Sequence, residues 1–222
     1  SFSTRCSESI AAWQSTAMMA DLVATDAFDM TVDGQTVGIK KIDDLQCWDV
    51  SRWFVGRPHH FGASHMMTRR LLALNTLNAQ LNAEDQCLMF RALLMGGALR
   101  LAKPLVMHRQ NGVSYKAKST TYALKKDKLI KGAKASLIES QQMVADAACL
   151  ERGVEVEALL QPSIAMNTFV VEVLTAKTMA DQCAAVKRAK KVSFGKVARF
   201  FAYAAFPFLY IPSMWIKSIA KQ

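Results

Sequence analysis

The chain has 222 residues, a formal net charge of +10 at neutral pH and 51% hydrophobic residues. This length and composition exclude a largely disordered chain and predict one globular domain, with room for a helical appendage. The positive charge favours an anionic neighbour, and nucleic acid, an anionic membrane leaflet or a phosphorylated substrate would each meet that requirement.

Short helices and strands are expected to alternate through the first half of the sequence. The Asp33-Gly34 pair predicts a turn, and the Gly96-Gly97 pair predicts the end of a helix. Pro104 interrupts an apolar run and favours a strand at a sheet edge. The expected elements are a helix over 7–20 with Ser7 as its cap, strands over 21–30 and 36–39, a loop or short helix over 43–49, a loop over 53–60, a helix over 69–74, a helix from 84 to about 94 and a strand over 99–106.

The predicted secondary structure changes after residue 114, where longer helical stretches begin. Long helices are predicted over 119–148 and 155–191, with few turn residues between them. From residue 193 the chain becomes aromatic and nearly free of acidic charge. We therefore expect three parts, residues 1–114, 115–192 and 193–222.

Three segments of the first half carry a recognisable pattern. Residues 60–70 read HFGASHMMTRR, residues 84–91 read EDQCLMFR, and residues 102–109 read AKPLVMHR, with Gly112 and Ser114 closing the pattern. In this order and spacing the segments resemble the family 2 glycosyltransferases, which carry a glycine followed by R-R, then E-D-x-x-L-x-x-R, then P-L-V-x-Y-R. Residues 20–34 resemble the D-L-V strand and D-G turn of the same family.

The resemblance implies part of an α/β domain of the GT-A, Rossmann-like type, followed by a helical region and a membrane-contacting tail. The family's D-x-D motif, which binds metal and nucleotide, occurs nowhere in these residues and is expected upstream of residue 1. Residues 1–114 would then be the acceptor-side half of the domain in a longer protein. The implied activity is inverting transfer of a sugar from a nucleotide-sugar donor to a glycan or lipid-linked acceptor, in cell-surface polysaccharide synthesis.

The acidic pair Glu84-Asp85 is the candidate catalytic centre. An inverting transfer needs a carboxylate that takes the proton of the acceptor hydroxyl as it attacks, and such a base contributes roughly 10²–10⁴-fold. The resemblance assigns this role to Asp85, whose charge a helix N-terminus would favour, with Glu84 orienting it or a sugar hydroxyl. The alternative is that the pair only caps the helix and complements its dipole.

Further candidate residues surround this pair in the three segments. A glycine lets a backbone approach a ligand closely, and two histidines, His59 and His60, are expected to line the cleft. The arginines are expected to meet phosphate or, equally, to form salt bridges. The candidate substrate-binding residues are His60, Gly62, Ala63, His65, Arg69, Arg91 and Arg109.

A divalent cation, Mg²⁺ or Mn²⁺, is implied for the complete enzyme, where it neutralises the leaving nucleotide diphosphate. Its main ligands are expected upstream of residue 1. His108 replaces the tyrosine that is commoner in the family, and we interpret it as a hydrogen-bonded strand residue with a metal role left open. Many relatives have a histidine where this chain has Asn111, so a third ligand is not assigned.

The tail over 193–222 combines a basic flank with an apolar, aromatic stretch. Pro207 and Pro212 interrupt the stretch, which is shorter than the ~20 apolar residues that a bilayer crossing requires. Tyrosine and tryptophan beside basic residues predict a segment that lies in a leaflet surface or re-enters it. The alternative is a C-terminal helix packed on the core. The membrane prediction suits a lipid-linked acceptor and places the protein on the inner face of the plasma membrane.

The sequence also bears on an alternative function, on further partners and on the cellular compartment. A non-catalytic, membrane-associated scaffold derived from a glycosyltransferase is the main alternative, and the helices after residue 114 are expected to form a spacer or a homo-oligomer surface. Nucleic acid is not an expected partner, because only the net charge supports it. Five cysteines without C-x-x-C spacing and a first segment unlike a signal peptide favour a reducing cytosol.

Overall fold

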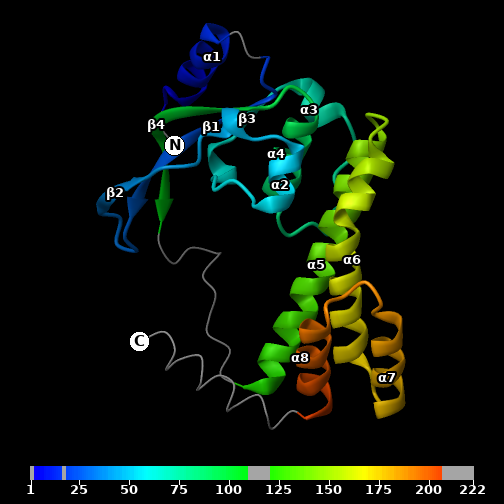
Figure 1. Cartoon of the computed structure of the whole chain (residues 1–222). Helices are drawn as coiled ribbons and strands as arrows, with labels where there is room; N and C mark the ends of the chain where they lie inside the picture. Colours follow the sequence, from blue (N-terminus) through cyan, green and yellow to red (C-terminus); the bar gives the residue numbers. More distant parts are fainter. Residues whose placement is uncertain (1–2, 17–18, 110–120, 207–222) are drawn as a thin grey trace. The chain divides into compact units, whose positions relative to one another are not determined.

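The computed structural model describes residues 3–16, 19–109 and 121–206 (Figure 1). The chain divides into two compact units, the first comprising Ser1–Lys116 and Gln142–Val156, the second Ala117–Gln141 and Glu157–Gln222. A small mixed sheet with helices forms the first unit, so the predicted α/β class is confirmed. The boundary expected after residue 114 lies outside the described residues, and the start of the expected tail, 193–206, belongs to the second unit.

The sheet of the first unit is built around one buried strand. β1 (Leu22–Met30) runs parallel to β4 (Ala98–Arg109) along its whole length. β3 (Met66–Met67) and β2 (Thr36–Lys40) pair antiparallel with the start and the end of β1, so they share its other edge. The near-continuous burial of β1 is typical of a strand covered on both faces. The predicted strands are confirmed, and β4 pairs only with β1 among the described strands.

The helices of the first unit differ from the predictions at three ends. α1 begins before Ser7, whose hydroxyl donates to the Thr4 carbonyl instead of capping the helix. α1 also ends at Ser15, five residues before the predicted end, where the backbone of Thr16 becomes extended. The loop predicted over 53–60 is partly wrong, because α2 reaches Val55; the Asp49 carboxylate caps this helix by accepting a hydrogen bond from the Arg52 backbone N–H. The helices are α1 (Arg5–Ser15), α2 (Val50–Val55), α3 (Arg69–Ala73) and α4 (Glu84–Leu94), with short 3₁₀ turns at Leu45–Cys47 and Gly62–Ser64.

The helix α4 is buried along most of its length. Every residue from Cys87 to Leu94 is buried, including Arg91. The Phe90 ring contacts the rings of Trp53 and Phe54 from α2, at centroid distances of 5.4 and 5.9 Å. α4 therefore belongs to the interior of the unit, and only its first turn reaches the surface.

One carboxylate connects the start of β1 to the end of α4. Asp21 accepts hydrogen bonds from the Arg70 guanidinium at 2.7 Å and from the Thr68 hydroxyl. The Gly96 backbone N–H donates a further bond to it at 2.8 Å. Burial raises the pKa of Asp21, but these three donors outweigh burial and hold the pKa below its usual value. Gly96 has room for no side chain, since a Cβ atom would lie 2.1 Å from the Met19 carbonyl oxygen.

Arg91 carries a charge in the interior of the first unit. Its guanidinium donates two hydrogen bonds to the Asp146 carboxylate, at 2.9 and 3.0 Å, and one to the Leu71 carbonyl. Both partners of the ion pair have 0% exposed side chains. The Asp146 carboxylate also accepts hydrogen bonds from the side-chain amides of Asn75 and Gln142. The phosphate contact predicted for Arg91 is therefore wrong, and the salt-bridged alternative holds.

In the part described after the sheet, residues 121–206, the chain forms the helices α5 (Tyr122–Ala148), α6 (Gly153–Thr175), α7 (Met179–Arg188) and α8 (Phe194–Ala205). α5 agrees with the helix predicted over 119–148. The single helical stretch predicted over 155–191 is wrong, because α6 ends at Thr175 and Thr178 caps a new helix, α7. The Thr178 hydroxyl accepts a hydrogen bond from the Asp181 backbone N–H, and the Asp181 carboxylate accepts one from the Thr178 backbone N–H. This T-x-x-D capping box was visible in the sequence.

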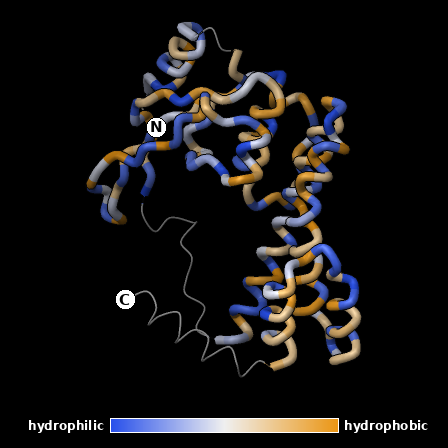
Figure 2. The backbone as a smooth tube through the Cα atoms, viewed as in Figure 1, coloured by the Kyte–Doolittle hydropathy of each residue, from blue (hydrophilic) through white to orange (hydrophobic). Residues whose placement is uncertain are grey.

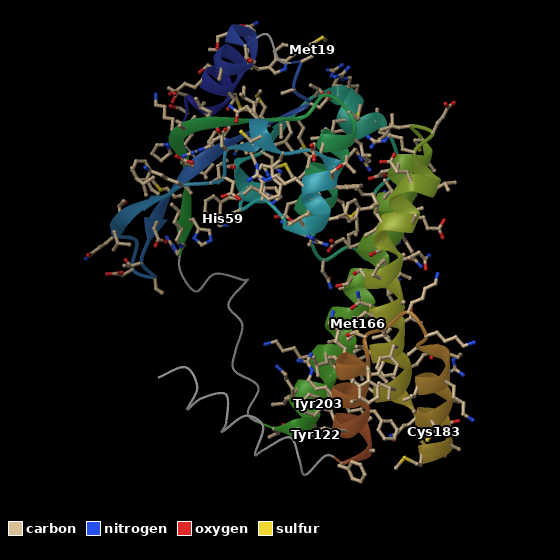
Figure 3. All side chains as sticks on the ribbon, viewed as in Figure 1. Met19, His59, Tyr122, Met166, Cys183 and Tyr203 are labelled. Carbon is tan, nitrogen blue, oxygen red and sulfur yellow. The ribbon has the colours of Figure 1, made fainter. Side chains whose placement is uncertain are left out.

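The apolar faces of these four helices form the core of the second unit. Figure 2 shows apolar and polar residues interspersed along them, as packing on one side requires. The Tyr122 hydroxyl donates to the Tyr203 carbonyl at 2.8 Å, and both residues are labelled in Figure 3. The described start of the segment 193–222 is thus a packed helix, whereas residues 207–222 lie outside the described part. The buried core residues are Ala133, Phe169, Val170, Val173, Leu174, Ala185, Val197 and Phe200.

Among the described helices, α6 is long and apolar enough to cross a membrane by length and composition. Its most apolar window is only 28% buried, and Pro162 lies inside the helix. Phe169, Val173 and Leu174 nevertheless pack in the core of the second unit. A single such helix is weak evidence for a membrane span, since a core helix passes the same criterion.

The buried ion pair generates a stability prediction. Asp146→Asn should lower the free energy of unfolding by roughly 3–5 kcal/mol, because Arg91 would keep a buried charge without its counter-charge. Urea denaturation followed by circular dichroism measures the change. The double variant Arg91→Met/Asp146→Leu should recover most of the loss. Glu155→Gln, which breaks the exposed Arg152–Glu155 pair, is the control and should leave the midpoint nearly unchanged. If Asp146→Asn lowers the free energy of unfolding no more than the control does, the buried ion pair does not stabilise the unit as proposed.

Candidate active site

A cavity of about 550 Å³ opens in the first unit beside the N-terminus of α4. Three parts of the chain form its walls: the segment before and within β3, the first two turns of α4 with Asn82 two residues before the helix, and the end of β4. The lining residues are His60, Phe61, Gly62, Ala63, His65, Met67, Asn82, Glu84, Asp85, Leu88 and His108. The walls therefore combine carboxylates, imidazoles, an amide and an aromatic ring, a set suited to a polar ligand.

Asp85 lies in the wall of this cavity, half-buried, in the first turn of α4. Its carboxylate accepts a hydrogen bond from the Gln86 backbone N–H at 2.9 Å and forms no ion pair with another described residue. The backbone at Gly62 lies directly against it, since a Cβ atom on Gly62 would be 2.6 Å from the Asp85 Cβ atom. Gly62 thus permits close approach, as predicted for a glycine here, but the group that it approaches is the Asp85 side chain.

Two buried histidines lie in the cavity wall. His65 Nε2 and His60 Nδ1 are 3.0 Å apart, and His60 Nε2 lies 3.1 Å from the side-chain amide nitrogen of Gln86. Burial lowers the pKa of His60, although the charge of Asp85 opposes this shift. Burial, the neighbouring His60 and the Arg5 guanidinium lower the pKa of His65 to about 3. Both imidazoles are therefore neutral at physiological pH, and they form a hydrogen-bonded row that ends beside Asp85.

His108, near the end of β4, also lines the cavity. Its Nδ1 atom lies 3.2 Å from the Lys40 ammonium, which forms an ion pair with Asp29 at 2.8 Å. The Phe61 ring lies between two imidazoles, with centroid distances of 5.2 Å to His108 and 5.0 Å to the exposed His59. The structure thus makes His108 a hydrogen-bonded strand residue, the interpretation that we favoured for it.

The structure brings together seven of the predicted site residues and leaves three apart. The cavity is lined by the predicted His60, Gly62, Ala63, His65, Glu84, Asp85 and His108. Arg69 and Arg109 are exposed and lie outside this lining, whereas Arg91 is buried against Asp146. Arg70 forms a salt bridge with Asp21. Asn111, Gly112 and Ser114 lie outside the described residues.

Three functional candidates escaped the sequence reasoning. Gln86 holds His60, and Asn82 and Phe61 line the cavity. Gln86 follows the E-D pair directly, so its position in the first turn of a helix was available as a signal. Asn82 and Phe61 carried no such signal, because their proximity depends on how two distant loops fold.

The described residues contain no group of three or more histidine, cysteine, aspartate or glutamate side chains that could hold a metal ion. The His60 and His65 rings are hydrogen-bonded to each other, and the His108 ring faces Lys40. These residues therefore do not fit a metal site by themselves, and no catalytic step is assigned to a metal here.

Comparisons of the chain with protein-family models, with curated proteins and with solved structures find no match.

The buried histidine pair makes the stability of the first unit depend on pH. The unfolded chain binds a proton at His65 below about pH 6.5, but the folded chain does so only near pH 3, so the free energy of unfolding falls as pH falls through this window. The slope reaches at most about 1.4 kcal/mol per pH unit for one site. His65→Gln should reduce it, as urea midpoints at several pH values would measure. The exposed His59→Gln is the control, and equal slopes for all three proteins would exclude this role for His65.

The contact between Gly62 and Asp85 predicts a steric effect. Gly62→Ala should lower the free energy of unfolding by about 1–3 kcal/mol, because the new methyl group forces the loop away from the start of α4. Thermal denaturation measures this loss. Gly38→Ala in β2 is the matched control, since a Cβ atom there meets nothing within 4 Å. Equal stability of the two variants would show that the loop yields without cost.

Proposed function

We propose that this chain forms the acceptor-side part of an inverting glycosyltransferase of the GT-A type, with Asp85 as the catalytic base. The placement of Asp85 carries the proposal: a half-buried carboxylate in a cavity wall, at a helix N-terminus, without an ion pair to another described residue. The three sequence segments supply the reaction class. The chain order β3, α3, α4 and β4, with β4 parallel to β1, is consistent with a Rossmann-like half-domain.

The proposed reaction is a single displacement. Asp85 accepts the proton of an acceptor hydroxyl while that oxygen bonds to the anomeric carbon of the donor sugar. The bond between this carbon and the nucleotide diphosphate breaks on the opposite face, and the diphosphate leaves with the electron pair, so the configuration inverts. The Gln86 backbone N–H in the first turn of α4 donates a hydrogen bond to this carboxylate and holds it in the cavity wall. The proton stays on Asp85 until product leaves.

The remaining wall residues suit a sugar acceptor. Glu84 and Asn82 are exposed at the start of α4 and offer hydrogen-bonding groups to hydroxyls. The Phe61 ring offers an apolar face of the kind that packs on a pyranose ring. His60 is neutral, and its ring is held by the side chain of Gln86. It therefore helps to fix the shape of the cavity wall, and Asp85 does not have to compete with it for the acceptor proton as a second charged group. The acceptor is a glycan, free or lipid-linked.

The donor is a nucleotide-sugar, whose diphosphate an Mg²⁺ or Mn²⁺ ion would neutralise in the complete enzyme. Such an ion supplies positive charge to the leaving group. This chain contributes the acceptor base, and the resemblance places the main metal and nucleotide ligands upstream of residue 1. The proposed role of the described residues is therefore to bind the acceptor and to move its proton.

The role of Asp85 is tested by substitution in the enzyme that contains this chain. Asp85→Asn should lower kcat by about 10²–10⁴-fold while leaving nucleotide-sugar binding unchanged, because the amide keeps the shape but cannot take the proton. Release of nucleotide diphosphate in the presence of acceptor measures turnover, and calorimetry measures donor binding.

Asp33→Asn removes an exposed carboxylate in the turn between β1 and β2 and serves as the matched control, with unchanged turnover expected. Retained turnover in Asp85→Asn would remove this residue as the base. A wild-type enzyme that turns over no donor and acceptor pair would instead favour the non-catalytic scaffold.

A further inference from the structure

An apolar groove runs between α7 and α8 in the second unit. It encloses about 460 Å³ and is lined by Cys183, Val186, Lys187, Phe194, Val197 and Phe201. Val197 lines the groove and also packs in the core of the second unit, so the groove reaches down to that core. Cys183, labelled on α7 in Figure 3, has an exposed thiol in this groove. The groove would offer a hydrocarbon chain an almost wholly apolar surface.

Large apolar side chains on and next to the two helices that form this groove are exposed to solvent. Phe194, which lines the groove from the first turn of α8, is 86% exposed. Met179 at the start of α7 and Phe206 just after α8 are also exposed. Isolated exposed apolar residues are ordinary, but several of them on two helices that share an apolar groove indicate a surface that is covered in the functional state.

The same stretch of chain is strongly basic. Between Gln182 and Phe206 it has six lysines and arginines and neither aspartate nor glutamate. One of the six, Arg188, forms an ion pair with Glu172, and the other five are exposed. Positive charge beside an apolar surface matches an anionic phospholipid leaflet, in which phosphates lie directly above acyl chains. A second copy of the chain fits poorly, because it would bring two basic faces together.

We infer that the α7–α8 face docks on an anionic phospholipid leaflet, with Phe194 among the acyl chains and hydrocarbon in the groove of Cys183. The exposed lysines lie at the level of the phosphates. This inference does not rest on the proposed transferase activity. It differs from the sequence prediction of a membrane-contacting tail, because the docking surface is built from two packed helices and includes residues before 193.

Vesicle flotation of the full chain tests the docking surface. Phe194→Glu should lower partitioning onto phosphatidylcholine vesicles containing phosphatidylserine by at least about tenfold, because it removes the inserted ring and adds a negative charge. Val154→Glu is the matched control, since Val154 is likewise 86% exposed but lies outside this face. Each of Lys190→Gln and Lys191→Gln should lower partitioning by up to about fivefold.

The thiol in the groove reports which part of the chain touches the lipid. With the phosphatidylserine vesicles, alkylation of Cys183 should slow by about tenfold or more when hydrocarbon covers it, as peptide mass spectrometry would measure. Cys47, also exposed but in the first unit, is the internal control and should react at an unchanged rate.

Three results would overturn the inference. The first is equal flotation of the wild type, Phe194→Glu and Val154→Glu. The second is unchanged alkylation of Cys183 on a chain that floats, which would assign the contact to another segment. The third is protection of Cys183 that rises with protein concentration in the absence of vesicles, which would identify a second copy as the occupant.

Discussion

The first unit depends on the need to neutralise the interior charge of Arg91. An unpaired ion of this kind costs several kcal/mol, so the Asp146 carboxylate must lie beside it whenever the unit is folded. Arg91 and Asp85 belong to the same helix, and fixing one end of α4 fixes the other. Asp21 fixes the turn after α4 in a similar way, because its carboxylate accepts a hydrogen bond from the Gly96 backbone N–H. The cavity thus owes its geometry to two ionic contacts that do not touch its lining.

Much of the fold could be predicted from local chemistry. Asp33-Gly34 and Gly96-Gly97 mark a turn and a helix end because glycine adopts positive φ at Gly34 and Gly97. The partner of Arg91, in contrast, lies 55 residues further along the chain. No local pattern indicates such a pairing, so the sequence left a phosphate contact and a salt bridge equally open for this arginine. The break at Thr178 had a local signal in its capping box, which the prediction of one long helix overlooked.

The candidate site was predictable in its residue types and less so in their contacts. Seven expected residues share one cavity because the loop before β3 folds over the start of α4. The row formed by His60, His65 and Gln86 depends on that fold, with spacings of 5 and 26 residues that match no regular element. Gly62 was singled out for a ligand and instead accommodates Asp85. The sequence thus identified Gly62 as a position of close approach, but it did not predict that Asp85 would be the group approached.

The division of the chain into units has a consequence for its biosynthesis. α5 and α6 each cross from one unit to the other, so the first unit is completed by residues 142–156, after the second has begun. A nascent chain that has emerged only as far as β4 holds Arg91 without its counter-charge. The counter-charge becomes available only when Asp146 has left the ribosome, so completion of the first unit must wait for the synthesis of α5.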